Sequence, residues 1–116
     1  MNEITRDALL AVLSLHIGER RGIHIQALVA ELLGTWGRGY NPADGRKVRE
    51  LVAELRRAGH HVCAHPASGY FLAENAAELD RTCLFLYDRA ISSLEQIAAM
   101  KRVSMPDLRG QLRLPT

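Results

Sequence analysis

Three side chains that could bind a metal ion lie at alternate positions of one short segment. His61, Cys63 and His65 would share one face of a strand, because Val62 and Ala64 between them point to the other face. Imidazole nitrogen and thiolate sulfur are zinc ligands, but a structural zinc site takes four ligands and no second cluster accompanies these three. We therefore expect no metal centre, and interpret the histidines as exposed side chains that can approach a phosphate.

No other group of side chains has the spacing of a catalytic site. The serines lack the flanking residues of a nucleophile motif, and neither an HExxH nor a paired-carboxylate pattern occurs. Gly37-Arg38-Gly39 lacks the Gly-Lys-Ser/Thr ending of a phosphate-binding loop. The sequence therefore predicts neither an enzyme nor a bound cofactor.

Basic side chains between residues 38 and 57 offer a different chemistry. This segment holds six Arg or Lys residues and three Asp or Glu residues. Its apolar residues recur at helical spacing, at Val48, Leu51, Val52 and Leu55. Steps of 100° per residue place charged residues on the opposite side of the helix, namely Arg46, Glu50 and Arg57 with Lys47 and Arg49 at their flanks. Arginine can donate to guanine edges or phosphates and lysine suits phosphate, so this face could contact nucleic acid.

Ordinary explanations compete with this interpretation. A charged helix face is often only solvated, and Glu50 could pair with Arg46 one turn away. Arg38 lies between Trp36 and Tyr40, and its Gly-rich loop could present it to a phosphate while Trp36 packs on the core. Alternatively, both aromatic residues serve core packing alone.

The length and composition are those of one globular domain. The chain has 116 residues, 47% hydrophobic and 24% charged, which is too apolar for a disordered chain. No apolar run reaches the roughly 20 residues that span a bilayer, and the start Met1-Asn2-Glu3 lacks the basic flank of an export signal. We therefore expect a cytoplasmic protein without membrane contact. Two cysteines are too few for a disulfide framework, and 5% aromatic residues disfavour a base-stacking surface for single strands.

Periodicity and capping residues predict four helices and a hairpin. The predicted helices cover residues 6–17, 26–33, 42–58 and 76–102, with Thr5, Asn41 and Asn75 as N-caps of the first, third and fourth. A minimal strand is expected at 23–25, and two further strands at 60–65 and 70–72 flank the turn Pro66-Ala67-Ser68-Gly69. Pro42 suits the first position of its helix, and Gly59 suits a left-handed stop. The fold class expected from this order is α+β.

The middle of the chain resembles a known family. The run RKVRELVAELRRAGHHV, from Arg46 to Val62, is followed by SGYFL, from Ser68 to Leu72. Both are similar to the winged-helix half of biotin-operon repressors and to small winged-helix proteins carried by bacteriophages. The resemblance covers about residues 6–73 and implies a winged helix-turn-helix domain at 1–73, although the loop 34–41 is longer than the tight turn typical of the motif. The repressors' ligand-binding domain has no counterpart here, so their ligand chemistry is not carried over.

The resemblance also implies a function. In such proteins the second helix of the motif enters the major groove and the hairpin, or wing, flanks it. It therefore implies a sequence-specific, double-stranded-DNA-binding transcription regulator of phage or mobile-element origin, associated with the nucleoid. The expected DNA contacts are Arg38, Arg46, Lys47, Arg49, Glu50, Arg57, His61, His65 and Ser68. The alternative is a winged-helix interaction module that binds a host, phage or replication protein.

The segment after residue 73 is expected to be a long C-terminal helix followed by a basic tail. The helix, within residues 74–102, would be about 40 Å long at 1.5 Å per residue, longer than the small domain before it. It carries two adjacent apolar stripes, so one can pack on the domain while the other needs a partner. The expected partner is a second copy in a twofold homodimer, held through Leu84, Tyr87, Ile91, Leu94 and Ala98. The tail at 103–116 is interpreted either as a frayed end or as a segment that docks on a partner.

Overall fold

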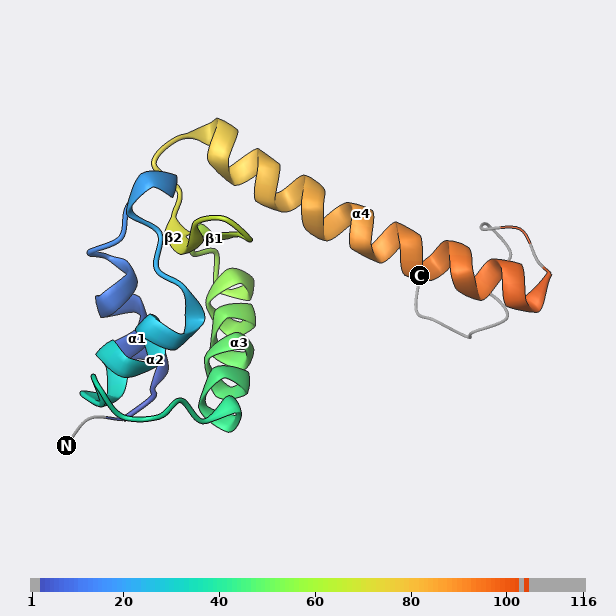
Figure 1. Ribbon diagram of the computed structural model, residues 1–116. Coiled ribbons are helices and arrows are strands. Elements are labelled where there is room, and N and C mark those ends of the chain that lie inside the picture. The colour runs from blue at the N-terminus through green and yellow to red at the C-terminus, as the bar shows by residue number, and fades with distance from the viewer. Residues whose placement is uncertain (1–2, 103, 105–116) are drawn as a thin grey trace. The chain divides into compact units, whose positions relative to one another are not determined.

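A computed structural model describes residues 3–102 and 104 of the chain. It contains four α-helices, a short 3₁₀ helix and a two-stranded antiparallel sheet (Figure 1), in agreement with the expected α+β class. The chain divides into two compact units, residues 1–82 and 83–116. The predicted basic tail at 103–116 lies outside the described residues except for Ser104.

The first helix, α1, covers Arg6–Leu13 and ends earlier than the sequence predicts. Its N-cap is Thr5 as expected, with the Ala8 backbone N–H donating to the Thr5 hydroxyl oxygen at 3.1 Å. The prediction that the helix continues to residue 17 is wrong, because the backbone of residues 16–18 bonds to the sheet instead. Leu72 N donates to the His16 carbonyl at 2.9 Å, and Gly18 N donates to the Leu72 carbonyl at 2.8 Å.

The second helix, α2, covers Ile25–Leu33, and Gly34 ends it in the left-handed conformation. Before it lies the 3₁₀ helix η1, Glu19–Arg21. The minimal strand expected at 23–25 is reduced to one position, because Ile25 already begins α2. Ile23 and Tyr70 exchange two backbone hydrogen bonds of 2.8 Å, which add this residue to the outer edge of the sheet.

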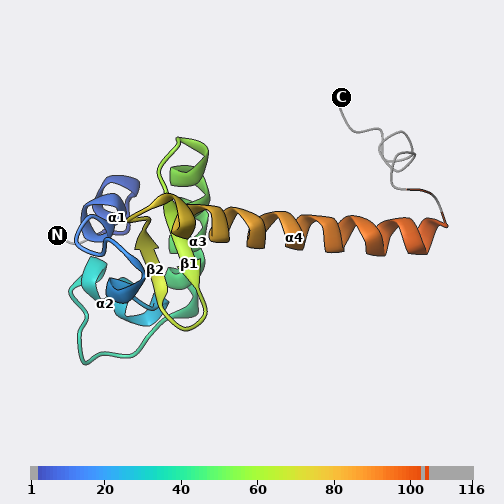
Figure 2. The same cartoon turned by 90° about the horizontal axis from the view of Figure 1, so that it is seen from above.

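The third helix, α3, covers Pro42–Arg57 and begins as its sequence predicts. The Asn41 side chain accepts a hydrogen bond from the Ala43 backbone N–H at 3.0 Å, and Pro42 occupies the first turn, where its missing N–H costs nothing. Gly59 follows the helix with a φ of 95°, a left-handed value that favours glycine. Figures 1 and 2 show the hairpin beside the end of α3, while the loop from α2 enters at its start.

The hairpin consists of β1, Val62–His65, and β2, Gly69–Leu72. The prediction that the first strand starts at residue 60 is wrong. The backbone there is still leaving the helix, since His60 N donates to the Leu55 carbonyl at 3.0 Å. Register pairs Val62 with Leu72 and Cys63 with Phe71. Successive side chains alternate between faces, so the first pair faces the helices and the second pair faces away from them.

One apolar core joins α1, α2, α3 and the first face of the hairpin. It consists of Leu9, Leu13, Ile23, Leu28, Val29, Leu32, Val48, Leu51, Val52, Leu55 and Val62. The apolar residues predicted at helical spacing on α3 are all in this list. The second face of the hairpin is also covered, since Cys63 and Phe71 are fully buried.

The last helix, α4, covers Ala76–Lys101. Its start uses the predicted pair, with the Glu78 backbone N–H donating to the Asn75 side chain at 2.9 Å. The Glu78 carboxylate then accepts from the backbone N–H groups of Glu74, at 2.9 Å, and Glu19, at 3.1 Å. This residue therefore caps α4 and ties it to η1. Within the described part of the chain, no helix is both long enough and apolar enough to cross a membrane.

Gly45 provides a test of the packing between α3 and the loop before it. A Cβ built on this buried helical glycine would collide with the Tyr40 hydroxyl. Alanine normally stabilises a helix relative to glycine by roughly 0.5–1 kcal/mol. Here we expect Gly45→Ala to destabilise the fold by about 1–3 kcal/mol, as overpacking does, measured by urea unfolding.

Gly39 is the matched control for this substitution, because a Cβ at Gly39 meets nothing within 4 Å and its φ is not left-handed. Gly39→Ala should leave the free energy of unfolding nearly unchanged. Adding Tyr40→Phe to Gly45→Ala should restore part of the loss. Equal stability of the Gly45→Ala variant and the parent would contradict the packing described.

Candidate nucleic-acid interface

The outward face of α3 carries the charged side chains that the sequence places there. Five of them are exposed, namely Arg46, Lys47, Arg49, Glu50 and Arg57. Ala53, at the middle of this face, has only a methyl side chain and is half-buried. Because the opposite side of α3 is the buried stripe, these charges cannot turn inward without breaking the core.

The cations of this face are not neutralised by ion pairs. In the described residues no ion pair joins Arg46, Lys47, Arg49 or Arg57 to a carboxylate, and the pair considered between Glu50 and Arg46 is not formed. Arg56 has a different role: its Nε donates to the Val62 carbonyl at 2.8 Å and so fastens the hairpin to α3. The outward face therefore presents a surplus of positive charge.

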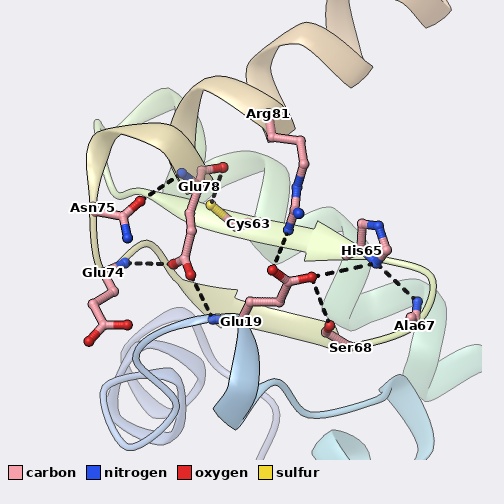
Figure 3. Close-up of polar contacts among 9 residues, drawn as sticks. All are labelled: Glu19, Cys63, His65, Ala67, Ser68, Glu74, Asn75, Glu78 and Arg81. Atoms are coloured by element: carbon pink, nitrogen blue, oxygen red, sulfur yellow. Dashed lines mark hydrogen bonds and ion pairs between the residues drawn. The ribbon is translucent and has the colours of Figure 1, made fainter.

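The hairpin turn lies against Glu19, a residue that the sequence did not single out (Figure 3). Ser68 Oγ donates to Glu19 Oε1 at 3.3 Å, and His65 Nδ1 lies 4.0 Å from the same oxygen. Arg81 Nη2 of α4 forms an ion pair with Glu19 Oε2 at 2.9 Å. We call Glu19, His65, Ser68 and Arg81 the Glu19 cluster. His65 and Ser68, two of the predicted DNA contacts, therefore already lie against Glu19. His61, the third predicted contact of this region, is exposed.

The partners of Glu19 in the Glu19 cluster favour the ionised form of its carboxyl group. The hydrogen bond and charge of Arg81 lower the pKa of Glu19 below its usual value, with smaller contributions from the Ser68 hydroxyl and from His65, against an opposing effect of desolvation. His65 Nδ1 also accepts a hydrogen bond from the Ala67 backbone N–H at 3.2 Å, which orients the ring in the turn. No local motif joins these residues, because they come from η1, the hairpin turn and α4.

Of the three residues expected on one exposed strand face, His61, Cys63 and His65, Cys63 is not exposed. Cys63 is fully buried, and its Sγ donates to the Glu78 carbonyl of α4 at 3.6 Å. His61 lies outside β1 and is exposed. The start of α4 covers the side of the hairpin on which Cys63 lies. The sequence alone did not reveal this contact, so this side was expected to be exposed to solvent. Among the described residues, no three His, Cys, Asp or Glu side chains are grouped so as to hold a metal ion.

The loop between α2 and α3 exposes an aromatic side chain. Trp36 is 60% exposed, and its Nε1 donates to Glu31 Oε2 at 3.2 Å. The prediction that Trp36 packs on the core is therefore wrong, whereas Tyr40 is half-buried against the core and fits over Gly45. Arg38 is exposed in the same loop, which leads into the start of α3.

The five residues predicted for dimerisation lie on α4 with different exposures. Leu84 and Tyr87 are 59% and 63% exposed. Ile91 and Leu94 are half-buried, and Ala98 is 8% exposed. Of these five residues, Leu84 and Tyr87 are therefore the two that expose most of their side chains.

Comparison with known proteins does not assign this chain to a family. No protein-family model, no curated protein and no solved structure matches this chain.

The lowered pKa of Glu19 predicts how the stability of the fold depends on pH. A carboxylate with a lowered pKa stabilises the fold above its unfolded pKa, and this contribution is lost as pH falls through the folded value. The stability difference between the parent and Glu19→Gln should therefore be largest at neutral pH and should shrink below about pH 4.5. Urea unfolding at pH values from 7 to 3 measures it.

Glu54→Gln, which removes one exposed carboxylate from α3, is the matched control. Its stability difference from the parent should not shrink over the range in which that of Glu19→Gln does. If the parent and Glu19→Gln keep a constant difference from pH 7 to 3, the ion pair of Glu19 with Arg81 does not stabilise the fold.

Proposed function

We propose that residues 3–82 form a winged helix-turn-helix domain that binds double-stranded DNA in a sequence-specific manner, and that the protein regulates transcription at the nucleoid. The single observation that carries this proposal is the outward face of α3. Four exposed cations lie there, opposite a continuous buried stripe, and none of them has an ion-pair partner among residues 3–102 and 104. An α-helix with its side chains fits into the major groove of B-form DNA, which is about 12 Å wide.

The arrangement around α3 supports the proposed fold. Three helices precede a hairpin, and β2 is flanked by β1 on one side and by Ile23 on the other, which is the strand order of a small wing sheet. Arg56 and the core hold the hairpin next to the end of α3. In winged-helix domains this placement lets the hairpin lie along the sugar-phosphate backbone of the DNA while the helix enters the major groove.

In the proposed complex, different side chains of α3 suit different groups of the DNA. Arg46 and Arg57 lie at the two ends of the outward face, where a guanidinium can bond guanine O6 and N7 or a phosphate. Lys47 and Arg49 flank the face and suit phosphates. Glu50 would repel phosphates but can accept a hydrogen bond from cytosine N4, which makes it a candidate for sequence discrimination.

The hairpin contributes less charge than the sequence alone suggests. His61 is exposed and can approach a phosphate, whereas Ser68 and His65 would have to exchange Glu19 for one. The carboxylate of Glu19 also places a negative charge at the base of the turn. We therefore assign most of the electrostatic attraction to α3 and to Arg38.

One observation favours a second candidate function, a module that binds another protein. Trp36 exposes most of its indole beside Arg38, and Trp and Arg are enriched among residues that dominate protein–protein interfaces. The two functions respond differently to salt. DNA binding weakens steeply with ionic strength because counterions are released, whereas an apolar protein interface changes little.

Selection of bound duplexes from a random pool provides the test of the proposed function. With the selected duplex, Arg46→Ala and Arg57→Ala should each weaken binding by about 1–3 kcal/mol, which is roughly a 5- to 150-fold rise in Kd. Fluorescence anisotropy at several salt concentrations measures it, and each lost phosphate contact should lower the salt slope by about one. Neither arginine faces the core, so the free energy of unfolding should change little.

Arg6→Ala and Arg20→Ala are the matched controls, because they remove the same charge from exposed positions outside α3. They should change Kd much less than the α3 variants. Trp36 is the only tryptophan of the chain, so its fluorescence reports independently on binding near the start of α3. Equal affinity of the parent and the doubly substituted Arg46/Arg57 variant would show that α3 is not the DNA-contacting helix, and no selected duplex at all would contradict the function.

A further inference from the structure

One turn of α4 is apolar on every side. Leu84, Phe85, Leu86 and Tyr87 follow each other directly, and steps of 100° distribute them around the helix. Their exposed fractions are 59%, 52%, 38% and 63%. A helical segment that is hydrophobic all round is normally buried, and leaving such side chains in water forfeits the free energy of burying them. Leu84 and Tyr87, the two most exposed of the four, lie on one side of this turn, and that side needs a covering element.

The spacing along α4 indicates that the covering element is another helix. Leu84, Tyr87, Ile91 and Leu94 are separated alternately by three and four residues, which is the spacing of side chains that interlock between paired helices. Ile91 and Leu94 are half-buried, whereas Leu84 and Tyr87 are exposed, so the pairing would centre on Leu84 and Tyr87.

The residues beside this row favour a second copy in the antiparallel direction. A twofold interface must be complementary to itself. In an antiparallel pair centred between Leu84 and Tyr87, the exposed Cys83 of one helix faces Ala90 of the other, and two small side chains allow close approach. On the other flank Arg81, which already pairs with Glu19 of its own chain, lies beside Asp88 of the other copy. A parallel pair brings neither combination together.

We propose that α4 forms an antiparallel pair with α4 of a second copy of this chain, centred on Leu84 and Tyr87. A contact between two single helices lies at the lower end of the size range of specific interfaces, so we expect dissociation in the micromolar range. Where the proposed DNA binding also holds, the twofold axis requires a DNA site that is an inverted repeat.

Sedimentation equilibrium without DNA tests the pairing. The full chain should be dimeric at tens of micromolar, and Leu84→Lys should raise the dimer dissociation constant at least tenfold. Ser93→Lys is the matched control, because Ser93 is exposed on another side of the same helix, and this variant should stay dimeric. Circular dichroism shows whether α4 stays helical in each variant. A monomeric parent, or a Leu84→Lys variant as dimeric as the parent, overturns the proposal.

Disulfide trapping tests the direction of the pair. In Ala90→Cys, oxidation with diamide should link Cys83 of one copy to the new thiol of the other and give covalent dimers. The parent and Ser93→Cys should give few, and Cys63 is buried in each. A dimeric protein in which Ala90→Cys is not trapped overturns the antiparallel arrangement.

These results are independent of DNA. A dimer that selects no duplex would leave the helix pair intact and remove the proposed function. A dimer that selects a single asymmetric site would contradict the inverted repeat alone.

Discussion

The backbone of β2 is hydrogen-bonded on both edges, and the first unit depends on this pairing. One edge bonds to β1, and on the other edge Tyr70 and Leu72 bond to Ile23, His16 and Gly18. An isolated hairpin of four-residue strands is marginal at best in water, and its unpaired backbone groups could not be buried without cost. The segment between α1 and α2 supplies the missing partners. It therefore ends α1 early and ties the hairpin to the helices.

Close approach of these segments requires small residues at the crossing points. A Cβ on Gly22 would meet the Ser68 carbonyl oxygen, and a Cβ on Gly69, whose φ is 81°, would meet the Ile23 carbonyl. Two glycines from distant parts of the sequence thus let two backbones lie side by side. The same proximity brings Glu19 under the hairpin turn, where Arg81 and Ser68 bind its carboxylate.

The sequence predicted the features that depend on neighbours within a few residues. The capping of α3 by Asn41, the start of α4 at Asn75 and Glu78, and the buried stripe of α3 follow from local spacing and were correct. The end of α1, the burial of Cys63 and the Glu19 cluster depend on contacts between segments that lie far apart in the chain. Periodicity carries no information about such contacts. For the candidate interface, the sequence therefore located the outward face of α3 but not the internal partner of the hairpin turn.

The Glu19 cluster decides how charge is distributed in the proposed complex with DNA. A phosphate approaching the hairpin turn would meet the Ser68 hydroxyl only by competing with a carboxylate that Arg81 already holds at 2.9 Å and that lies 4.0 Å from His65 Nδ1. Like charge between that carboxylate and the phosphate opposes the exchange. The outward face of α3 has no such competitor, because its cations have no ion-pair partner in the described residues. In the proposed domain the hairpin therefore acts mainly by fixing the position of α3, and α3 supplies most of the charge that attracts the phosphates.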